Sequence, residues 1–261
     1  MKFRTLNRID RVLTEKENVL NVYYTAGFPD LDDTIRIARE LEAAGADLLE
    51  IGIPFSDPLA DGPTIQESSQ IALENGMTLI KLFEQLNDLR KEVQIPVLLM
   101  GYINLILQFG IAQFCEACER AEVDGIIVPD LPMEEYLDEY QELFDSHGLH
   151  NIFLISPNTQ PERIKLIDEK SSGFIYMVSS SSITGAKKGI EEQQLAYFQR
   201  IKEMELKNPR LIGFGISDRE TFQKACEYAN GAIIGSAFIK QLQQDASKEM
   251  IHKFVTEIKG K

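Results

Sequence analysis

Short apolar runs alternate with longer amphipathic segments along almost the whole chain. The runs are rich in β-branched residues and are bounded by turn-forming residues, as is typical of strands that are covered on both faces of a parallel sheet. Between them, hydrophobic positions recur with the spacing of a helix face, as in LDDTIRIARELEAAG and TLIKLFEQLNDLRKEV. The pattern predicts strands at Leu20–Thr25, Leu48–Ile51, Val97–Met100, Gly125–Val128, Ile152–Ile155, Phe174–Val178, Leu211–Gly213 and Ala232–Ile234.

Eight β/α units in a chain of 261 residues favour an α/β fold of the closed (β/α)8 type, a TIM barrel. An open doubly wound sheet usually has fewer strands and a glycine-rich first turn, and the turn TAGFPD lacks that motif. We expect an extra N-terminal helix, roughly from Phe3 to Glu17, and a short extra helix after strand 8. No linker divides the chain, so residues 1–261 are predicted to form a single barrel domain.

The formal net charge of -14 argues against general binding of nucleic acids or anionic membranes, which require clustered cations. The start MKFRTLNRID lacks the apolar core of a signal peptide, and no apolar run approaches the roughly 18 residues that span a bilayer. We therefore expect a cytoplasmic protein that interacts with neither nucleic acid nor membrane.

The cysteines and histidines give little support to a metal site or a hydrolase. Cys115 and Cys118 form a CxxC in a helical segment without a second ligand pair nearby, so they are interpreted as small apolar residues of a helix face. His147, His150 and His252 are expected at the surface, away from any nucleophile motif.

Candidate chemistry gathers in LLEIGIPFSDPLADGP, which contains three carboxylates. Glu50 ends the second strand, where barrel enzymes place catalytic groups, and its apolar neighbours would raise its pKa and suit it to general acid–base catalysis. A structural alternative is a Glu50 satisfied by hydrogen bonds inside the barrel. Asp57 and Asp61 precede Pro and Gly, so ordinary turn chemistry also explains them.

Two late glycine motifs predict a phosphate site. IGFGIS follows strand 7 and IIGSAFIKQL leads from strand 8 into a short helix, which is the usual location of phosphate binding in such barrels. Backbone N–H groups would bind the anion there without lysine or arginine. The loop SSSSITGAKKGIEE after strand 6 fits either a mobile lid or a disordered surface excursion.

Glu50, the block PFSDPLADGPTIQ, and then MGYINLI, VPDLP, SITGA, GFGIS and GSAFIK follow one another in order along the chain. Over essentially its whole length the sequence thereby resembles the alpha subunits of tryptophan synthase. The resemblance implies a TIM barrel that cleaves indole-3-glycerol phosphate to indole and glyceraldehyde 3-phosphate by reverse aldol chemistry, in tryptophan biosynthesis. It implies no cofactor and no metal in this subunit.

The resemblance also assigns roles to residues. Glu50 matches the family's catalytic glutamate and is expected to be protonated at the start, in an apolar setting. Asp61 matches its catalytic aspartate, which is expected to be ionised in a polar loop and to accept the indole N–H. Substrate contacts are implied for Tyr23, Tyr102, Ile127, Tyr176, Thr184 and Phe214, and phosphate contacts for Gly185, Gly215, Gly235 and Ser236.

The family further implies a partner. Such subunits bind a pyridoxal-phosphate-dependent beta subunit in an alpha2-beta2 heterotetramer and pass indole to it, and Asp57 and Pro58 match the loop that touches this partner. Two positions depart from the family pattern. Ser180 replaces an arginine found in many relatives, and Gly101 stands where bulkier residues are common and is expected to loosen the indole pocket.

Two other functions stay open at this stage. Another phosphate-binding barrel, an isomerase or lyase, would share the late glycine motifs, although a Schiff-base aldolase needs a strand-end lysine that the eight predicted strands lack. A non-catalytic barrel subunit would keep the phosphate site but would not need Glu50 and Asp61.

Overall fold

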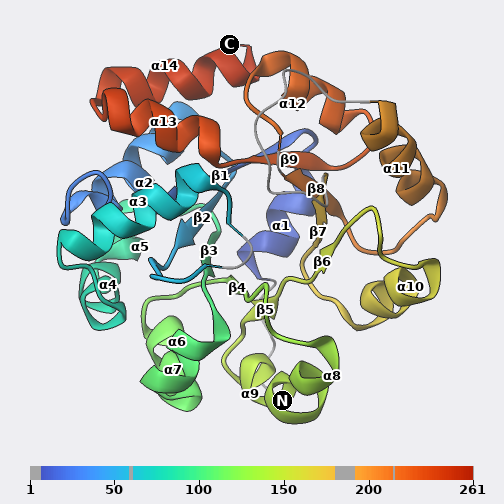
Figure 1. Cartoon of the computed structure of the whole chain (residues 1–261), viewed down its shortest axis with the longest axis horizontal. Coiled ribbons are helices and arrows are strands. Elements are labelled where there is room, and N and C mark those ends of the chain that lie inside the picture. The colour runs from blue at the N-terminus through green and yellow to red at the C-terminus, as the bar shows by residue number, and fades with distance from the viewer. Residues whose placement is uncertain (1–6, 59–60, 180–191, 214, 261) are drawn as a thin grey trace.

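The computed structural model of the chain describes residues 7–58, 61–179, 192–213 and 215–260. Parallel strands curl around a central axis and helices surround them, as in a TIM barrel (Figure 1). The strands are β1 Val19–Thr25, β2 Leu48–Gly52, β3 Val97–Met100, β4 Gly125–Ile127, β5 His150–Asn151, β6 Leu154–Ile155, β7 Ile175–Val178, β8 Arg210–Gly213 and β9 Gly231–Ile234.

Apart from α1, which precedes the first strand, the helices follow the strands along the chain and form the outer layer. Their bounds are α1 Arg8–Glu15, α2 Asp33–Ala44, α3 Pro63–Glu74, α4 Leu79–Leu86, α5 Leu89–Glu92, α6 Ile103–Phe109, α7 Ile111–Arg120, α8 Met133–Glu135, the π-helix η1 Tyr136–Tyr140, α9 Gln141–Ser146, α10 Pro161–Lys170, α11 Glu192–Glu203, α12 Arg219–Cys226, α13 Ser236–Gln244 and α14 Lys248–Lys259. The predicted short extra helix after the last strand is α13. The final helix α14 packs against α2 and so joins the end of the chain to its beginning.

The barrel closes through the segment from β5 to β6. The hydrogen-bonded strand order is β5-β4-β3-β2-β1-β9-β8-β7-β6, and all neighbouring pairs are parallel. Between β5 and β6, Ile152 N donates to the carbonyl of Ile126 beside β5, and Tyr176 N donates to the carbonyl of Phe153 beside β6. The single fifth strand predicted at Ile152–Ile155 is thus wrong in detail, because this segment pairs with β4 at its start and with β7 at its end.

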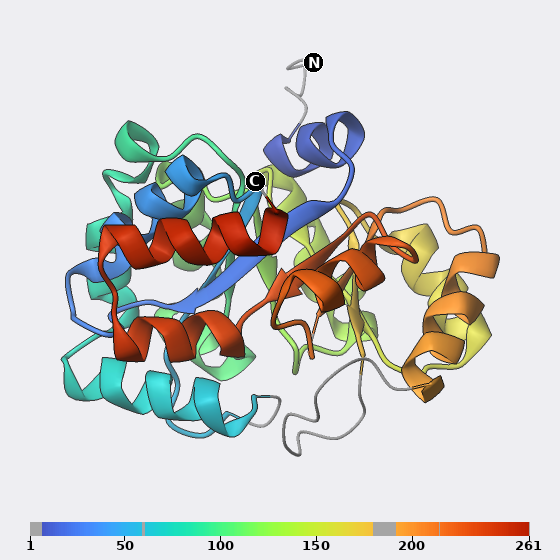
Figure 2. The same ribbon diagram turned by 90° about the horizontal axis from the view of Figure 1, so that it is seen from above.

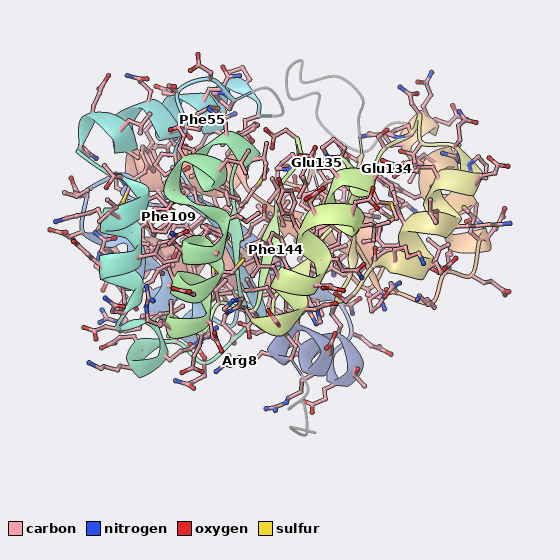
Figure 3. All side chains as sticks on the ribbon, turned by 90° about the horizontal axis from the view of Figure 1, so that it is seen from below. Arg8, Phe55, Phe109, Glu134, Glu135 and Phe144 are labelled. Carbon is pink, nitrogen blue, oxygen red and sulfur yellow. The ribbon has the colours of Figure 1, made fainter. Side chains whose placement is uncertain are left out.

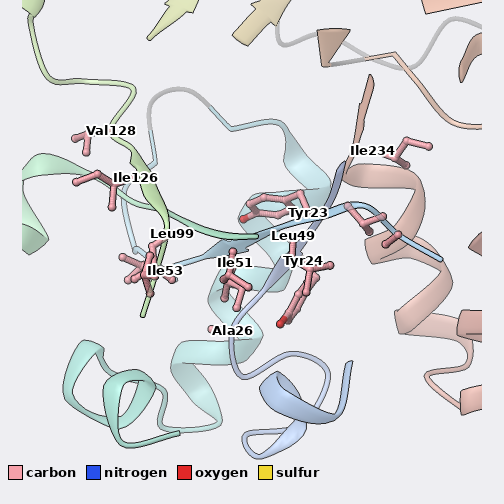
Figure 4. Close-up of a cluster of buried hydrophobic side chains, with 14 of the residues drawn as sticks. Tyr23, Tyr24, Ala26, Leu49, Ile51, Ile53, Leu99, Ile126, Val128 and Ile234 are labelled. Atoms are coloured by element: carbon pink, nitrogen blue, oxygen red, sulfur yellow. The ribbon is translucent and has the colours of Figure 1, made fainter. Parts of the chain in front are cut away.

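Alternating side chains divide the apolar core into two layers. Inward-facing residues in and next to the strands, together with two residues of α1, form an inner cluster inside the barrel, which comprises Ile9, Leu13, Val19, Leu48, Leu98, Ile127, Ile152, Phe174, Tyr176, Leu211 and Ile233. Outward-facing residues such as Tyr24, Leu49 and Ile51 pack against the helices in a second, larger cluster (Figure 4). This period of two explains why the strands read as continuous apolar runs.

Helix α1 covers the end of the barrel at which the strands begin. Asn7 caps this helix by accepting a hydrogen bond from Ile9 N, and Ile9 and Leu13 enter the inner cluster. Figure 2 shows α1 at one end of the molecule. The predicted N-terminal helix is confirmed over Arg8–Glu15, and residues 3–6 of its predicted range lie outside the described residues.

His150 does not lie at the surface as the sequence indicated. It starts β5, is 7% exposed, and its Nε2 lies 3.0 Å from Asp10 Oδ2 of α1. The strand begins two residues earlier than predicted and thereby carries the ring against α1. The cysteines of the CxxC are both buried in α7, and burial raises the pKa of the Cys115 thiol to about 12.

In the part of the chain that the structure describes, no helix has the length and apolar character needed to cross a lipid bilayer.

Candidate active site

Glu50 faces the interior of the barrel from β2. In the parallel ladder it is paired with Tyr23 of β1 and Leu98 of β3, and its side chain lies on the inward face together with that of Leu48. The residue is 1% exposed, and Asn21 Nδ2 donates a hydrogen bond of 3.0 Å to its Oε2. Phe55, which follows β2, lies at the opposite end of the barrel from Arg8 of α1 (Figure 3). The site is therefore at the C-terminal end of the strands, as expected.

The surroundings of Glu50 favour its protonated form. The pKa of this carboxyl is raised to about 8: burial is the largest cause, the charge of Asp61 acts in the same direction, and the hydrogen bond from Asn21 opposes both. No lysine or arginine occurs between Arg39 and Lys81 to reverse this effect. A carboxyl group with such a pKa can both give and take a proton near neutral pH.

Asp61 lies two residues before α3 and is buried, at 8% exposure. Its Oδ2 accepts a hydrogen bond of 2.9 Å from the hydroxyl of Tyr102, whose ring packs on Phe55 at a centroid distance of 5.2 Å. Gln66 Nε2 holds the backbone carbonyl of Asp61 at 2.8 Å. Asp61 is therefore buried, whereas we expected it in a polar loop. Burial raises its pKa, and the hydrogen bond from the Tyr102 hydroxyl opposes this rise by stabilising the carboxylate.

Two tyrosines lie over glycines on neighbouring strands. A Cβ on Gly52 would come within 2.1 Å of the Tyr23 hydroxyl, and a Cβ on Gly213 within 2.3 Å of the Tyr176 hydroxyl. Burial and the nearby carboxyl groups hold the pKa of both tyrosines well above their ordinary value. The glycines thus make room for protonated hydroxyls next to the carboxyl pair.

Ile127 and Gly101 are two further residues that were predicted at the indole pocket. Ile127 ends β4 and is fully buried in the inner cluster. Gly101 does not leave an empty space, because a Cβ there would meet Ile53 Cδ1 at 2.8 Å. We expected Gly101 to loosen the indole pocket, but Ile53 packs against this glycine and fills the space.

Polar backbone groups meet at the ends of β7, β8 and β9. Gly215 is exposed after β8 with φ +79°, and a Cβ there would lie 3.7 Å from Ser179 Oγ, which follows β7. Gly235 precedes α13, whose first turn begins with the exposed Ser236, and it lies beside Tyr23. Because β8 and β9 are paired, the two glycines lie at the same edge of the barrel. Free N–H groups at a helix start suit an anion.

Some predicted residues lie outside the described residues, namely Ser180, Thr184, Gly185 and Phe214. Of the predicted partner-contact residues, Asp57 is exposed in the loop after β2 and Pro58 is partly exposed. Ser56 Oγ donates to Asp57 Oδ2 at 2.5 Å, so this carboxylate is held by its own turn.

The sequence reasoning missed two residues that shape the site. Asn21 is a polar residue inside the apolar run LNVYYT, on the same face as Tyr23, and this alternation was a usable signal. Asp130, in the motif VPDLP, accepts a hydrogen bond of 2.9 Å from Ile103 N at the start of α6. It thereby fixes the backbone next to Tyr102.

Comparison with known proteins gives a consistent result. A family model described as tryptophan synthase alpha chain matches residues 9–260. A tryptophan synthase alpha chain of Flavobacterium psychrophilum is 55% identical over 97% of this chain and 100% of its own length. One from Christiangramia forsetii is 54% identical over 98% and 99%.

Solved structures agree with the sequence matches. The tryptophan synthase A-subunit of Pyrococcus furiosus superposes with a TM-score of 0.86 at 37% identity, covering 94% of this chain and 99% of that one. A chain from a structure of Mycobacterium tuberculosis tryptophan synthase gives a TM-score of 0.87 at 27% identity, covering 98% of both chains. Its sequence identity is lower than that of the two sequence relatives, but it has the same fold.

Proposed function

The chain belongs to the tryptophan synthase alpha chain family, and we propose that it cleaves indole-3-glycerol phosphate to indole and glyceraldehyde 3-phosphate. It is a carbon–carbon lyase whose chemistry is carried by Glu50 and Asp61, in one barrel domain spanning residues 1–261. The observation that carries this proposal is a pair of buried carboxyl groups at the C-terminal end of β2, one of which has a pKa of about 8.

The first step is protonation of the indole ring at C3 by the Glu50 carboxyl. As the proton arrives, positive charge develops on the ring and spreads to the nitrogen. Asp61 accepts the indole N–H and stabilises this charge, and the Tyr102 hydroxyl helps to keep Asp61 ionised. A neutral Glu50 beside an ionised Asp61 is the arrangement that such a step requires, and the charge of Asp61 supports it by raising the pKa of Glu50.

The second step breaks the carbon–carbon bond. The Glu50 carboxylate formed in the first step removes the proton of the substrate hydroxyl next to the bond. The hydroxyl becomes the carbonyl of glyceraldehyde 3-phosphate, and the electrons of the broken bond return to the ring and restore the aromatic indole. Glu50 ends the cycle protonated, so the reaction needs no other proton donor or acceptor.

The remaining site residues hold the substrate. Gly215, Gly235 and Ser236 bind its phosphate through the backbone and the start of α13, together with Gly185. We propose that the indole ring is contacted by Tyr23, Tyr102, Ile127, Tyr176 and Phe214, and that Thr184 also contacts the substrate. This arrangement supports a phosphorylated substrate in spite of the net charge of -14, since backbone N–H groups supply the positive end.

The partner is a tryptophan synthase beta subunit, which carries pyridoxal phosphate and receives indole within an alpha2-beta2 heterotetramer. Structures of tryptophan synthase among the similar proteins support such an assembly. The exposed turn around Asp57 and Pro58, beside the site, suits contact with the partner. A cytoplasmic location fits this role in biosynthesis.

An indole-release assay with and without a beta subunit tests substrate, reaction and partner together. We expect indole and glyceraldehyde 3-phosphate in equal amounts and a higher rate with the partner present. Binding of indole-3-glycerol phosphate without formation of either product, in both conditions, would instead support a non-catalytic subunit.

A further inference from the structure

Asn21 is a buried amide on the inner face of β1, next to Glu50. It is 0% exposed and pairs in register with Leu48 of β2 and Ile233 of β9. Its Nδ2 donates to Glu50 Oε2, whereas its Oδ1 is buried and has no hydrogen-bond partner among the described residues. An unpaired buried oxygen is destabilising, so a strand interior is an unfavourable place for an amide that serves packing alone.

We propose that Asn21 positions the Glu50 carboxyl group for proton transfer: its amide donates a hydrogen bond to the ionised form and, after rotating by half a turn, accepts one from the protonated form. The inference rests on the proposed function, since it concerns the two protonation states through which Glu50 passes. Asn21 touches no reacting atom and acts only through Glu50.

Glu50 needs a partner of this kind because its two forms have opposite hydrogen-bonding needs. The carboxylate only accepts, whereas the carboxylic acid has an O–H to donate. Leu48 and Leu98 beside it offer neither function. An amide offers both from one side chain, and the unpaired Oδ1 of Asn21 gives up no hydrogen bond among the described residues when the amide turns.

The other groups that face Glu50 do not replace Asn21. The titratable groups that act on its carboxyl are Asp61 from the loop after β2, Tyr23 from β1 and Tyr176 from β7. None of them carries positive charge, so within the described structure Asn21 is the group that stabilises the carboxylate.

Three variants test the proposal. Asn21→Val and Asn21→Leu both remove the donor and the acceptor; the first keeps a side chain suited to a strand, and the second keeps roughly the size of the amide. Asn151→Val is the matched control, because Asn151 is also a buried strand amide with an unpaired Oδ1, in β5 rather than beside Glu50. Retained far-ultraviolet circular dichroism identifies the variants that fold.

The first readout is the titration of Glu50 in the ligand-free protein, followed by carbon-13 NMR of its carboxyl and assigned by difference from Glu50→Gln. In both Asn21 variants we expect the midpoint to move upward by about one pH unit, since a hydrogen bond to the carboxylate is lost, and no movement in Asn151→Val. An unchanged midpoint in a folded Asn21 variant would overturn the proposal, whatever reaction the protein catalyses.

The second readout is the pH profile of indole release in the complex with a beta subunit. We expect kcat to fall about tenfold in Asn21→Val, with KM changed less than about threefold. The alkaline limb of the pH profile should move to higher pH by as much as the midpoint of the Glu50 titration does. An equal loss in Asn151→Val, or a loss without movement of the limb, would show a merely structural role. If the unaltered protein releases no indole, the proposed function fails, but the NMR titration still decides the role of Asn21.

Discussion

Asp47, before β2, and Glu50, within β2, are buried carboxyl groups in opposite electrostatic settings. Asp47, directly before the strand, is 3% exposed and is bound by Lys16 at 2.8 Å, Lys259 at 2.5 Å and the backbone N–H of Leu20. These partners outweigh burial and lower its pKa. Glu50, within the strand, is equally buried but has a neutral amide as its hydrogen-bond donor, and its pKa rises.

Asp124, before β4, repeats the arrangement of Asp47. Arg90 lies 2.6 Å and Arg8 3.1 Å from its carboxylate, and Val97 N donates to it. Burial alone therefore does not distinguish the proposed catalytic carboxyl of Glu50 from the structural carboxyl groups of this barrel. The distinguishing feature is whether cations and backbone donors pair with the carboxyl group, as they do at the end covered by α1, or whether such partners are missing, as at Glu50 among the described residues.

The largest expected effect is at Glu50. Glu50→Gln removes the proton donor and base, so we expect indole release to fall by at least about 10⁴-fold, while the protein stays folded and binds glycerol phosphate. Steady-state kinetics and calorimetric titration with glycerol phosphate measure both parts. Turnover close to that of the unaltered protein would sink the assignment.

Asp61→Asn should cost about 10³-fold in kcat. A neutral amide cannot offset the charge that develops on the indole ring, as a preorganised carboxylate does. The same kinetic assay applies. A loss below about tenfold would reduce Asp61 to a residue that only orients the substrate.

Asp124→Asn tests the other end of the barrel. It leaves Arg90 and Arg8 without their shared carboxylate, so we expect the free energy of unfolding to fall by about 3 kcal/mol in urea, with kcat of the folded protein nearly unchanged. The exposed Asp57→Asn is the control and should change stability by less than about 0.5 kcal/mol. A large loss of kcat in a folded Asp124→Asn protein would contradict the division between the two ends.

Glu50→Gln should also be more stable than the unaltered protein at neutral and alkaline pH. The folded pKa of Glu50 is about 8, against an ordinary value of 4.5, so the folded state binds more protons than the unfolded state between these values. The unaltered protein thus loses stability as pH rises from about 4.5 to about 8, by a few kcal/mol in total, and the glutamine variant is spared this loss. Urea unfolding at pH 5, 7 and 8.5 should show a widening gap, and a constant gap would contradict the raised pKa.

The smallest expected effect concerns Tyr102. Tyr102→Phe removes the hydroxyl that stabilises ionised Asp61, so the pKa of Asp61 should rise further, the acid limb of kcat should move to higher pH, and kcat should fall about tenfold. Tyr24→Phe is the control, since its hydroxyl donates to the Thr34 carbonyl outside the barrel. Similar losses in both variants would count against a specific role for Tyr102.

Local pattern predicted most of the fold and the position of Glu50, whereas only the family resemblance distinguished Asp61 from Asp57. The strands were found to within one or two residues because buried parallel strands are continuously apolar, and Glu50 stood out as a charge in such a run. The division between β5 and β6 was missed because it arises from closure of the barrel. The segment pairs with β4 at its start and with β7 at its end, and a short stretch of sequence does not reveal these partners. The roles of Asn21 and Asp130 were missed for a related reason: their partners are distant in sequence.

The pairing of β1 with β9 has a kinetic consequence. The other paired strands follow one another directly along the chain, whereas Val19 of β1 meets Gly231 of β9 across more than two hundred residues. Joining such distant segments is entropically costly and slow. Since β1 carries Asn21 and Tyr23, and β9 leads into Gly235, we expect enzymatic activity to return only with the slowest phase of refolding, after most helix signal has recovered. Stopped-flow circular dichroism with timed activity assays would show whether the two recover together.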